Sequence, residues 1–416
     1  MNAMNGTAVG GHKLPIVYVF TVSSLACKYG LPEYMSFSLR QALISQPDAS
    51  VVLASNFQEC KKMKTDVDLL EGIVPIDTDV IRSNRTRAFY NASSNIFQSD
   101  AWGELWITSA LRFFLLEDLM IDKKYNEMIH IEADNLLYGK LTSILPILRA
   151  NYKGLAATPL NTSKTFITAS VLWIASLATL VKFNDFMLAL ALNANKTWDN
   201  YIEWLRPHAC CKHGGVAQDS KGMGLKPFAV NEMSMLAYYR HIARHDFHNL
   251  PIVPAWKYFQ NRHIINISEY SPSGREAGVA TGAGVWDPNS WGQFLGGTHS
   301  KGGRDRGFSD SNHVAGQAMR TTNCRPAILC GNSSMHTISK YSIGIQKNAT
   351  YLDSHNATKT KRCYTAPFVH CPINITAQEF GPWVPLWNLH VHSKRTQQYV
   401  SQPCKCGDGI ELPFEL

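Results

Sequence analysis

The sequence lacks the charge pattern of a nucleic-acid-binding surface. Its net charge is +8, from 40 Lys and Arg against 32 Asp and Glu in 416 residues. The charges are scattered, however, with no long Lys/Arg run and no basic stripe interleaved with aromatic residues. A nucleic-acid partner is therefore not expected, although the positive balance is compatible with a small anionic ligand.

No apolar run is long enough to cross a membrane. The candidate, residues 166–181, holds 16 residues without a charge, whereas a spanning helix needs about 20. Ser, Thr and Ala dilute its hydrophobicity further, so we predict a buried helix there and no membrane span. Residues 1–13 contain no apolar core of a signal peptide, and we predict that they are disordered.

Three sequence motifs that would define a reaction are also missing. The chain has no Gly-x-Gly-x-x-Gly fingerprint and no Walker loop, so dinucleotide oxidoreductases and P-loop enzymes gain no support. It also has no His-Glu-x-x-His pair, which weakens the case for a metal hydrolase.

Cysteine and glycosylation signals are plentiful, by contrast. The ten cysteines are an even number, and ten Asn-x-Ser/Thr sequons are present. Both features favour an oxidising lumen, and so the secretory pathway, over the cytoplasm. The alternative is a cytoplasmic protein whose sequons are fortuitous.

The first part of the chain alternates between strand and helix patterns. Apolar, β-branched runs at 14–21, 51–54 and 73–76 predict strands, and 34–44 predicts a helix. This alternation indicates an α/β fold with a mostly parallel sheet. Ligands gather at the carboxyl ends of such strands. Thr21 and Val22 are therefore either nucleotide contacts or an ordinary turn.

An acidic pair follows another apolar strand. The segment 129–138 reads Ile-His-Ile-Glu-Ala-Asp-Asn-Leu-Leu-Tyr. On a strand, residues two apart face the same side, so Glu132 and Asp134 can converge on one ion. Carboxylate oxygens suit Mg²⁺ or Mn²⁺. The alternative is that both acids only cap a loop.

Two charged residues lie in predicted helices. Arg112, in the helix predicted at 99–121, could bind a phosphate or pair with Glu117 or Asp118. Glu232 stands near the start of a later helix, where a carboxylate is favoured by the dipole. It could equally bind a sugar hydroxyl or act as a base.

Two further stretches carry candidate ligand-binding residues. In segment 285–299, Asp287 precedes Gly296 and Gly297, which would let the backbone approach a ligand closely. Farther on, His390 and His392 alternate along a predicted strand, so both imidazoles can face one metal ion. The Lys394 side chain that follows could face a phosphate.

Together these segments resemble a GT-A-type glycosyltransferase. Glu132-Ala133-Asp134 matches the Asp-x-Asp signature of that fold, with Glu in place of the first Asp. Segment 287–297 resembles the Asp…Gly-Gln-Phe/Tyr-Leu-Gly-Gly stretch of some of these enzymes. Segment 389–394 resembles their C-terminal Leu-His-x-His-Ser-Lys strand. The order of the motifs, between positions 14 and 396, carries most of the specificity.

The resemblance implies a GT-A-like fold, in which a Rossmann-type sheet flanked by helices is joined to an irregular, loop-rich acceptor side. It implies a nucleotide-sugar-binding half at 14–150, an acceptor-binding and catalytic half at 151–396, and a tail at 397–416. A nucleotide-diphosphate sugar would be the donor and a glycan or glycoprotein the acceptor.

The resemblance also assigns roles to single residues. Asp134, with His390 or His392, would hold Mn²⁺ or Mg²⁺, and Glu232 or Asp287 would orient or deprotonate the acceptor hydroxyl. An inactive carbohydrate- or nucleotide-binding relative is the main alternative. The donor would contact the following residues: Thr21, Val22, Arg112, Glu132, Gln293, Gly296, Gly297 and Lys394.

Overall fold

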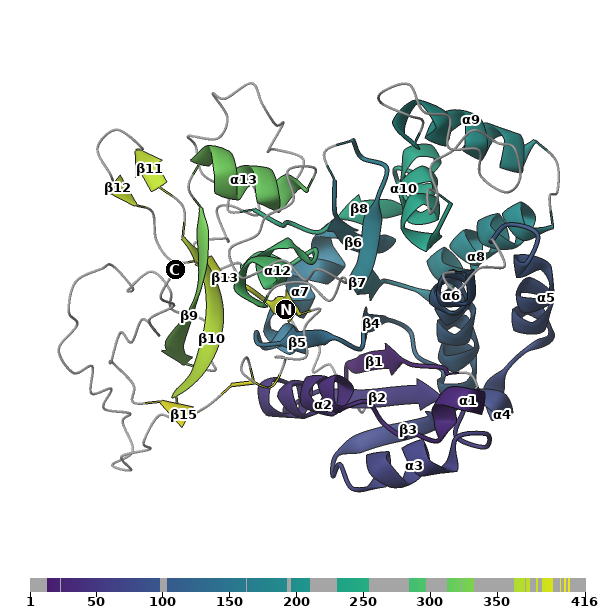
Figure 1. Ribbon diagram of the computed structural model, residues 1–416, viewed down its shortest axis with the longest axis horizontal. Coiled ribbons are helices and arrows are strands. Elements are labelled where there is room, and N and C mark those ends of the chain that lie inside the picture. The colour runs from purple at the N-terminus through teal and green to yellow at the C-terminus, as the bar shows by residue number, and fades with distance from the viewer. Residues whose placement is uncertain are drawn as a thin grey trace, which may run out of the picture.

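The computed structural model describes residues 13–22, 24–97, 103–161, 163–192, 196–209, 230–253, 284–296, 313–322, 324–332, 363–370, 372–374, 379–380, 384–391, 397, 400–401 and 403–404. A seven-stranded sheet forms its centre, in the order β3-β2-β1-β4-β7-β6-β8 (Figure 1). Its strands are β1 Pro15–Val19, β2 Ser50–Ser55, β3 Ile73–Asp77, β4 Met128–Ile131, β6 Leu155–Pro159, β7 Ile167–Ile174 and β8 Phe247–Asn249.

Most neighbouring strands of this sheet are parallel. The pairs β1–β2, β2–β3, β1–β4 and β6–β8 are parallel, and β7 is antiparallel to both β4 and β6. Because side chains alternate along a strand, Ile16 and Tyr18 enter one core and Val17 enters the other.

Helices cover both faces of the sheet. On one face lie α2 Glu33–Ser45, α3 Lys61–Asp68 and α7 Leu141–Asn151. The other carries α5 Asn84–Ser93, α6 Gly103–Lys123, α8 Leu177–Ala191, α9 Thr197–Ala209 and α10 Glu232–Ile242. The expected α/β class, a mostly parallel sheet flanked by helices, is therefore confirmed. Among the described residues, no helix combines the length and hydrophobicity that crossing a membrane requires.

The order of the strands reverses between β1 and β4. From β1 the chain proceeds outward through β2 and β3, and then returns by α4 Thr78–Ile81, α5 and α6 to β4 on the other side of β1. In open α/β sheets, ligands bind outside the carboxyl ends of the strands at such a reversal. The strand order therefore predicts a ligand-binding site at the carboxyl ends of β1 and β4.

The prediction of a buried helix at 166–181 is wrong. Residues 167–174 form β7, which is buried along its whole length, and α8 begins only at Leu177. A fully buried strand shows no alternation of apolar and polar residues, so its pattern cannot be distinguished from that of a buried helix. Here residues 167–174 form a strand because they pair in antiparallel fashion with both β4 and β6.

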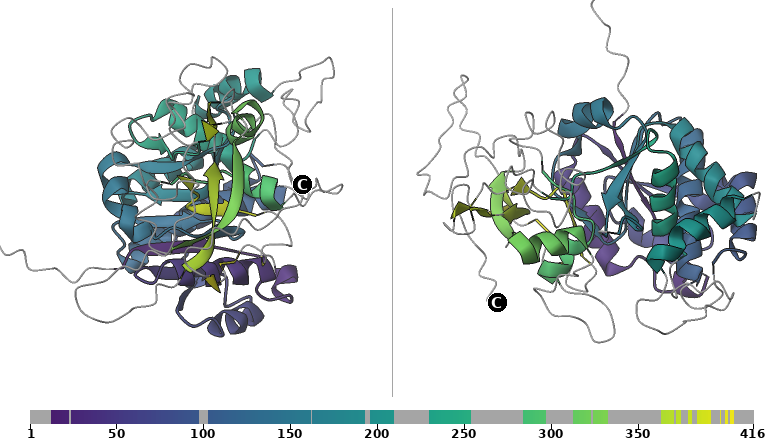
Figure 2. Two further views of the ribbon diagram at one scale, coloured as in Figure 1. Left: turned by 90° about the vertical axis from the view of Figure 1, so that its left-hand side faces the viewer. Right: turned by 90° about the horizontal axis from the view of Figure 1, so that it is seen from above.

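The remaining elements pack beside the main sheet. Figures 1 and 2 show β9 and β10 on the side away from α8 and α9. A third core joins β5 to α12, α13, β9 and β10. The elements of this part are β5 Asn135–Leu137, α12 Ser290–Gly296, α13 Val314–Thr322, β9 Arg325–Asn332, β10 Cys363–His370, β11 Pro372–Asn374, β12 Glu379–Phe380, β13 Val384–Pro385, β14 Asn388–His390 and β15 Pro403–Cys404.

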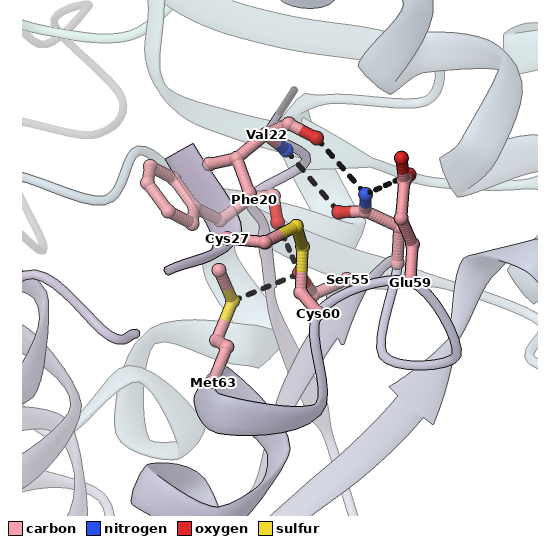
Figure 3. The surroundings of a disulfide bond; sticks show 8 residues. Phe20, Val22, Cys27, Ser55, Glu59, Cys60 and Met63 are labelled. Atoms are coloured by element: carbon pink, nitrogen blue, oxygen red, sulfur yellow. Dashed lines mark hydrogen bonds between the residues drawn. A yellow bond between two sulfur atoms is a disulfide. The ribbon is translucent and has the colours of Figure 1, made fainter. Parts of the chain in front are cut away.

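A disulfide fastens the loop that follows β1. Cys27, at the end of α1 Ser24–Cys27, is bonded to Cys60, just before α3 (Figure 3). The Asn56 side chain joins the same two segments, because it accepts from the Val22 amide at 3.2 Å and donates to the Val22 carbonyl at 2.9 Å. The carboxyl ends of β1 and β2 are therefore held together.

Candidate metal site at the end of β4

The two acids of the Glu-Ala-Asp motif lie in a turn. Strand β4 ends at Ile131, and a tight turn leads into β5. The Asn135 amide closes this turn on the Glu132 carbonyl at 3.1 Å. The two carboxyl groups thus converge through a turn, and not along one strand face as the sequence predicted.

The pairing of β5 with β14 brings His390 to this turn. The strands are antiparallel, and His390 stands opposite Asn135 in their register. The Val391 amide extends the ladder by donating to the Asp134 carbonyl at 3.1 Å. A strand from far along the chain is thereby fixed beside the acidic turn.

Three potential metal ligands meet here. The His390 Nε2 atom lies 3.0 Å from Asp134 Oδ1 and 3.7 Å from Glu132 Oε2. One ligand atom from each residue can be chosen so that all three lie within 4.8 Å of one another. Two carboxylates and an imidazole suit Mn²⁺ or Mg²⁺. Glu132, expected to contact the donor, is thus also a candidate metal ligand.

The neighbouring carboxylates stabilise the protonated form of His390. Burial alone would lower its pKa, but the carboxylates of Asp134, Glu132 and Asp287 outweigh burial and raise it to about 9. An ion would take the place of the imidazole proton, since a metal ligand must be neutral imidazole.

Arg112 links the metal site to a second acid. Its guanidinium Nη1 lies 2.5 Å from Glu132 Oε1, and Nη2 lies 3.1 Å from Glu232 Oε1. Of the two alternatives for Arg112, the ion pair with Glu117 or Asp118 is not formed. Glu117 pairs with Arg85, and Asp118 accepts from the Ser83 amide and the Thr86 hydroxyl.

Glu232 is a buried acid at the start of α10. The helix is capped by Asn231, whose side chain accepts from the Ser234 amide. Burial raises the pKa of Glu232 to about 7, although Arg112 counteracts the rise. The carboxyl group is therefore poised to exchange a proton near neutral pH.

Asp287 has a different environment, because the backbone surrounds its carboxylate. Oδ1 accepts from the amides of Asn289 and Trp291 at 2.8 and 3.0 Å. Oδ2 accepts from those of Gly292 and His390 at 2.7 and 2.9 Å. These bonds tie the start of α12 to β14. Gly292 permits the close approach, because a Cβ there would meet the His390 carbonyl oxygen at 1.9 Å.

Two buried asparagines, which the sequence did not mark, complete this junction. The Asn388 amide donates to Asn135 Oδ1 at 2.9 Å and to the Asp287 carbonyl at 3.1 Å. Asn135 in turn donates to the Ser170 carbonyl at 2.7 Å. The sequence offered one clue to their role, which is that each lies within two residues of a predicted metal ligand.

Another missed residue is Tyr34, at the start of α2. Burial and the charge of Asp134 together raise the pKa of its hydroxyl to about 12. The Asp134 carboxylate therefore acts on the Tyr34 hydroxyl through its charge.

The other candidates lie around this centre or outside the described residues. Thr21 and Val22 are half-buried at the end of β1, next to β4 in the sheet. Gln293 is half-buried within α12, and Gly296 is the last residue of that helix. Gly297, His392 and Lys394 lie outside the described residues.

No protein-family profile and no curated protein sequence matches the chain. Solved structures do match, and the first example is apo mouse xyloside xylosyltransferase 1, with 10% identity and a TM-score of 0.38 over 62% of this chain and 93% of that one. The PaToxG glycosyltransferase matches with 11% identity and a TM-score of 0.33, over 56% and 70% of the two chains. The UDP-bound glycosyltransferase domain of the YGT toxin has 7% identity and a TM-score of 0.31, over 57% and 79%. At these values the activity has to be argued from the site itself.

Proposed function

We propose that the protein is a metal-dependent glycosyltransferase, which moves a sugar from a nucleotide-diphosphate donor to a hydroxyl group of a glycan or glycoprotein. The observation that carries the proposal is the convergence of Glu132, Asp134 and His390 at the end of β4. This group stands at the reversal of strand order, where open α/β sheets bind their ligands.

The donor would lie across the carboxyl ends of β1 and β4. Thr21 and Val22 flank one side of this position, and the acidic turn flanks the other. The diphosphate then belongs beside the candidate metal ligands. We assign its further contacts to Gln293, Gly296, Gly297 and Lys394, as the sequence motifs suggest.

The proposed reaction exchanges one bond for another at the sugar. The acceptor oxygen bonds to the anomeric carbon, the bond from that carbon to the diphosphate breaks, and the nucleoside diphosphate leaves with the electron pair. A divalent ion held by Glu132, Asp134 and His390 would stabilise the charge on the departing diphosphate. The acceptor proton passes to a carboxylate.

Glu232 is the better of the two candidate bases. Its pKa of about 7 suits proton transfer at neutral pH. The carboxylate oxygens of Asp287 already accept four backbone amides, which suits a residue that positions His390 and α12.

We also propose an oxidising compartment, such as the lumen of the secretory pathway. The Cys27–Cys60 disulfide supports this, since such bonds persist mainly in secreted and luminal proteins. Cys324 is disulfide-bonded as well.

The test is to incubate the protein with a panel of UDP- and GDP-sugars and Mn²⁺, and to measure both free nucleotide and transferred sugar. Asp134→Ala and His390→Ala should each reduce the rate by at least about 100-fold, because each removes a metal ligand. Asp122→Ala, which alters an exposed acid paired with Lys123, serves as the control.

Equal turnover by wild-type protein and Asp134→Ala would contradict the proposal. Donor or glycan binding in calorimetry without any turnover would instead identify an inactive binding relative.

A further inference from the structure

Arg112 connects the metal site to the proposed base through one buried side chain. Only 9% of the Arg112 side chain is exposed, compared with 18% for Glu132 and 5% for Glu232. The guanidinium uses different nitrogens for the two acids, Nη1 for Glu132 and Nη2 for Glu232. A planar fork of this kind fixes both partners in orientation, which a lysine could not do.

The contact also decides which way Glu132 faces. Arg112 binds the Oε1 atom of Glu132, while Oε2 is the atom near His390. Each carboxylate oxygen therefore has its own partner, and the one nearest the imidazole is directed toward the candidate metal position. Loss of a residue that holds a metal ligand in this way typically weakens metal binding by about 10- to 100-fold.

We infer that Arg112 is a positioning residue, which directs Glu132 toward the metal ion and holds Glu232 in place for the acceptor. The role rests on the proposed function, and it differs from the phosphate contact that the sequence alone suggested.

The charges around Arg112 support this role. Its guanidinium is paired with the carboxylates of Glu132 and Glu232, and the Asp134 carboxylate also favours its charged form. Without Arg112 these carboxylates would lack a compensating positive charge, and the buried Glu232 would lose the ion pair that offsets its desolvation.

The experiment measures Mn²⁺ affinity by calorimetry for wild-type protein and for Arg112→Met. Removing a positive charge would by itself tighten cation binding, so weaker binding reports the loss of positioning. We expect Mn²⁺ to bind about 10- to 100-fold more weakly, the usual effect of losing such a support. Arg112→Lys keeps the charge but lacks the fork, and should bind with intermediate affinity.

Arg85→Met is the matched control. Arg85 also bridges two acids, with its Nε 3.0 Å from Glu117 Oε1 and its Nη2 2.6 Å from Asp185 Oδ1, but it lies on α5. Its Mn²⁺ affinity should equal that of wild type. Arg112→Met/Glu232→Gln relieves the unpaired buried charge, and provides a folded variant if Arg112→Met does not fold.

Unchanged or tighter Mn²⁺ binding by folded Arg112→Met, or by the double variant, would overturn the inference, as would wild-type affinity in Arg112→Lys. The measurement needs no sugar donor. It therefore separates this inference from the proposed activity, which fails if wild-type protein binds Mn²⁺ but transfers no sugar, or if Asp134→Ala turns over as fast as wild type.

Discussion

Glu232 and Asp287 show how the surroundings of a carboxyl group decide its use. Both are buried, and burial raises the pKa of each. Asp287 accepts four backbone amides, whereas Glu232 accepts from the guanidinium of Arg112. On this basis we propose that Asp287 maintains the structure of the site and that Glu232 exchanges a proton with the acceptor.

A pH profile tests the role of Glu232. As a base it must be ionised, so with a pKa of about 7 the transfer rate should rise as the pH increases through 7 and then level off. The measurement is kcat/KM against pH. Glu232→Gln should lose most of the rate, typically 100-fold or more, along with this rise. A variant that kept the wild-type profile would exclude Glu232 as the base.

Replacement of Asp287 should act on stability as well as on the metal site. In Asp287→Asn an NH₂ group replaces one acceptor oxygen, so about two backbone amides lose their partner. At about 1–3 kcal/mol for each unsatisfied group, we expect a loss of roughly 2–6 kcal/mol in the free energy of unfolding. Denaturant titration measures this loss. A decrease in activity with unchanged stability would favour a direct catalytic role instead.

The sequence identified candidate site residues more easily than it identified the residues that they contact. Asp134 and His390 were both selected in advance, and they lie 3.0 Å apart. The alternative pairing of Arg112 with Glu117 or Asp118 was wrong, because neighbours on a helix surface are three or four residues apart, and not five or six. The acids that Arg112 does contact depend on how α6 is rotated against the sheet. That rotation results from packing over many side chains, and the residues near Arg112 in sequence do not determine it.

At the level of elements, the apolar runs of β1, β2 and β3 were recognisable because they are short and bounded by polar residues. Strand β7 was taken for part of a helix, since burial on both faces removes its alternation. The register of β5 against β14 could not be predicted, because it joins segments whose contacting asparagines are 253 residues apart. Yet this register is what places His390 beside Asp134.

The disulfide after β1 offers a prediction at the same scale. Cys27 and Cys60 are separated by 33 residues, and closing a loop of that length is worth about 4 kcal/mol in the chain-entropy account. The double variant Cys27→Ser/Cys60→Ser should therefore unfold at a lower denaturant concentration. It should also bind the nucleotide donor more weakly, because Val22 lies in the loop that the disulfide restrains. Wild-type stability in the double variant would contradict this expectation.

At the scale of the whole molecule, the candidate ligands join two parts of the protein. Glu132 and Asp134 follow the main sheet, whereas His390 belongs to a strand that shares a core with α12, α13, β9 and β10. A bound ion would therefore stabilise the contact between these parts, in addition to its chemical role.

Thermal unfolding with and without Mn²⁺ tests this connection. An ion present at 100 times its Kd adds about 2.7 kcal/mol to the stability of a protein that binds it only when folded. We expect Mn²⁺ to raise the Tm and a chelator to reverse the change. Asp134→Ala should show no Mn²⁺-dependent shift, whereas Asp122→Ala should behave like wild type.

The pairing of β5 with β14 also has a consequence for biosynthesis. Asp134 leaves the ribosome long before His390, so the acidic turn must wait for more than half of the chain before its imidazole neighbour exists. Until β14 has folded back, the growing polypeptide cannot bring Glu132, Asp134 and His390 together. Metal binding at this site is thus deferred until β14 is in place, because a nascent chain that ends before β14 lacks the imidazole ligand.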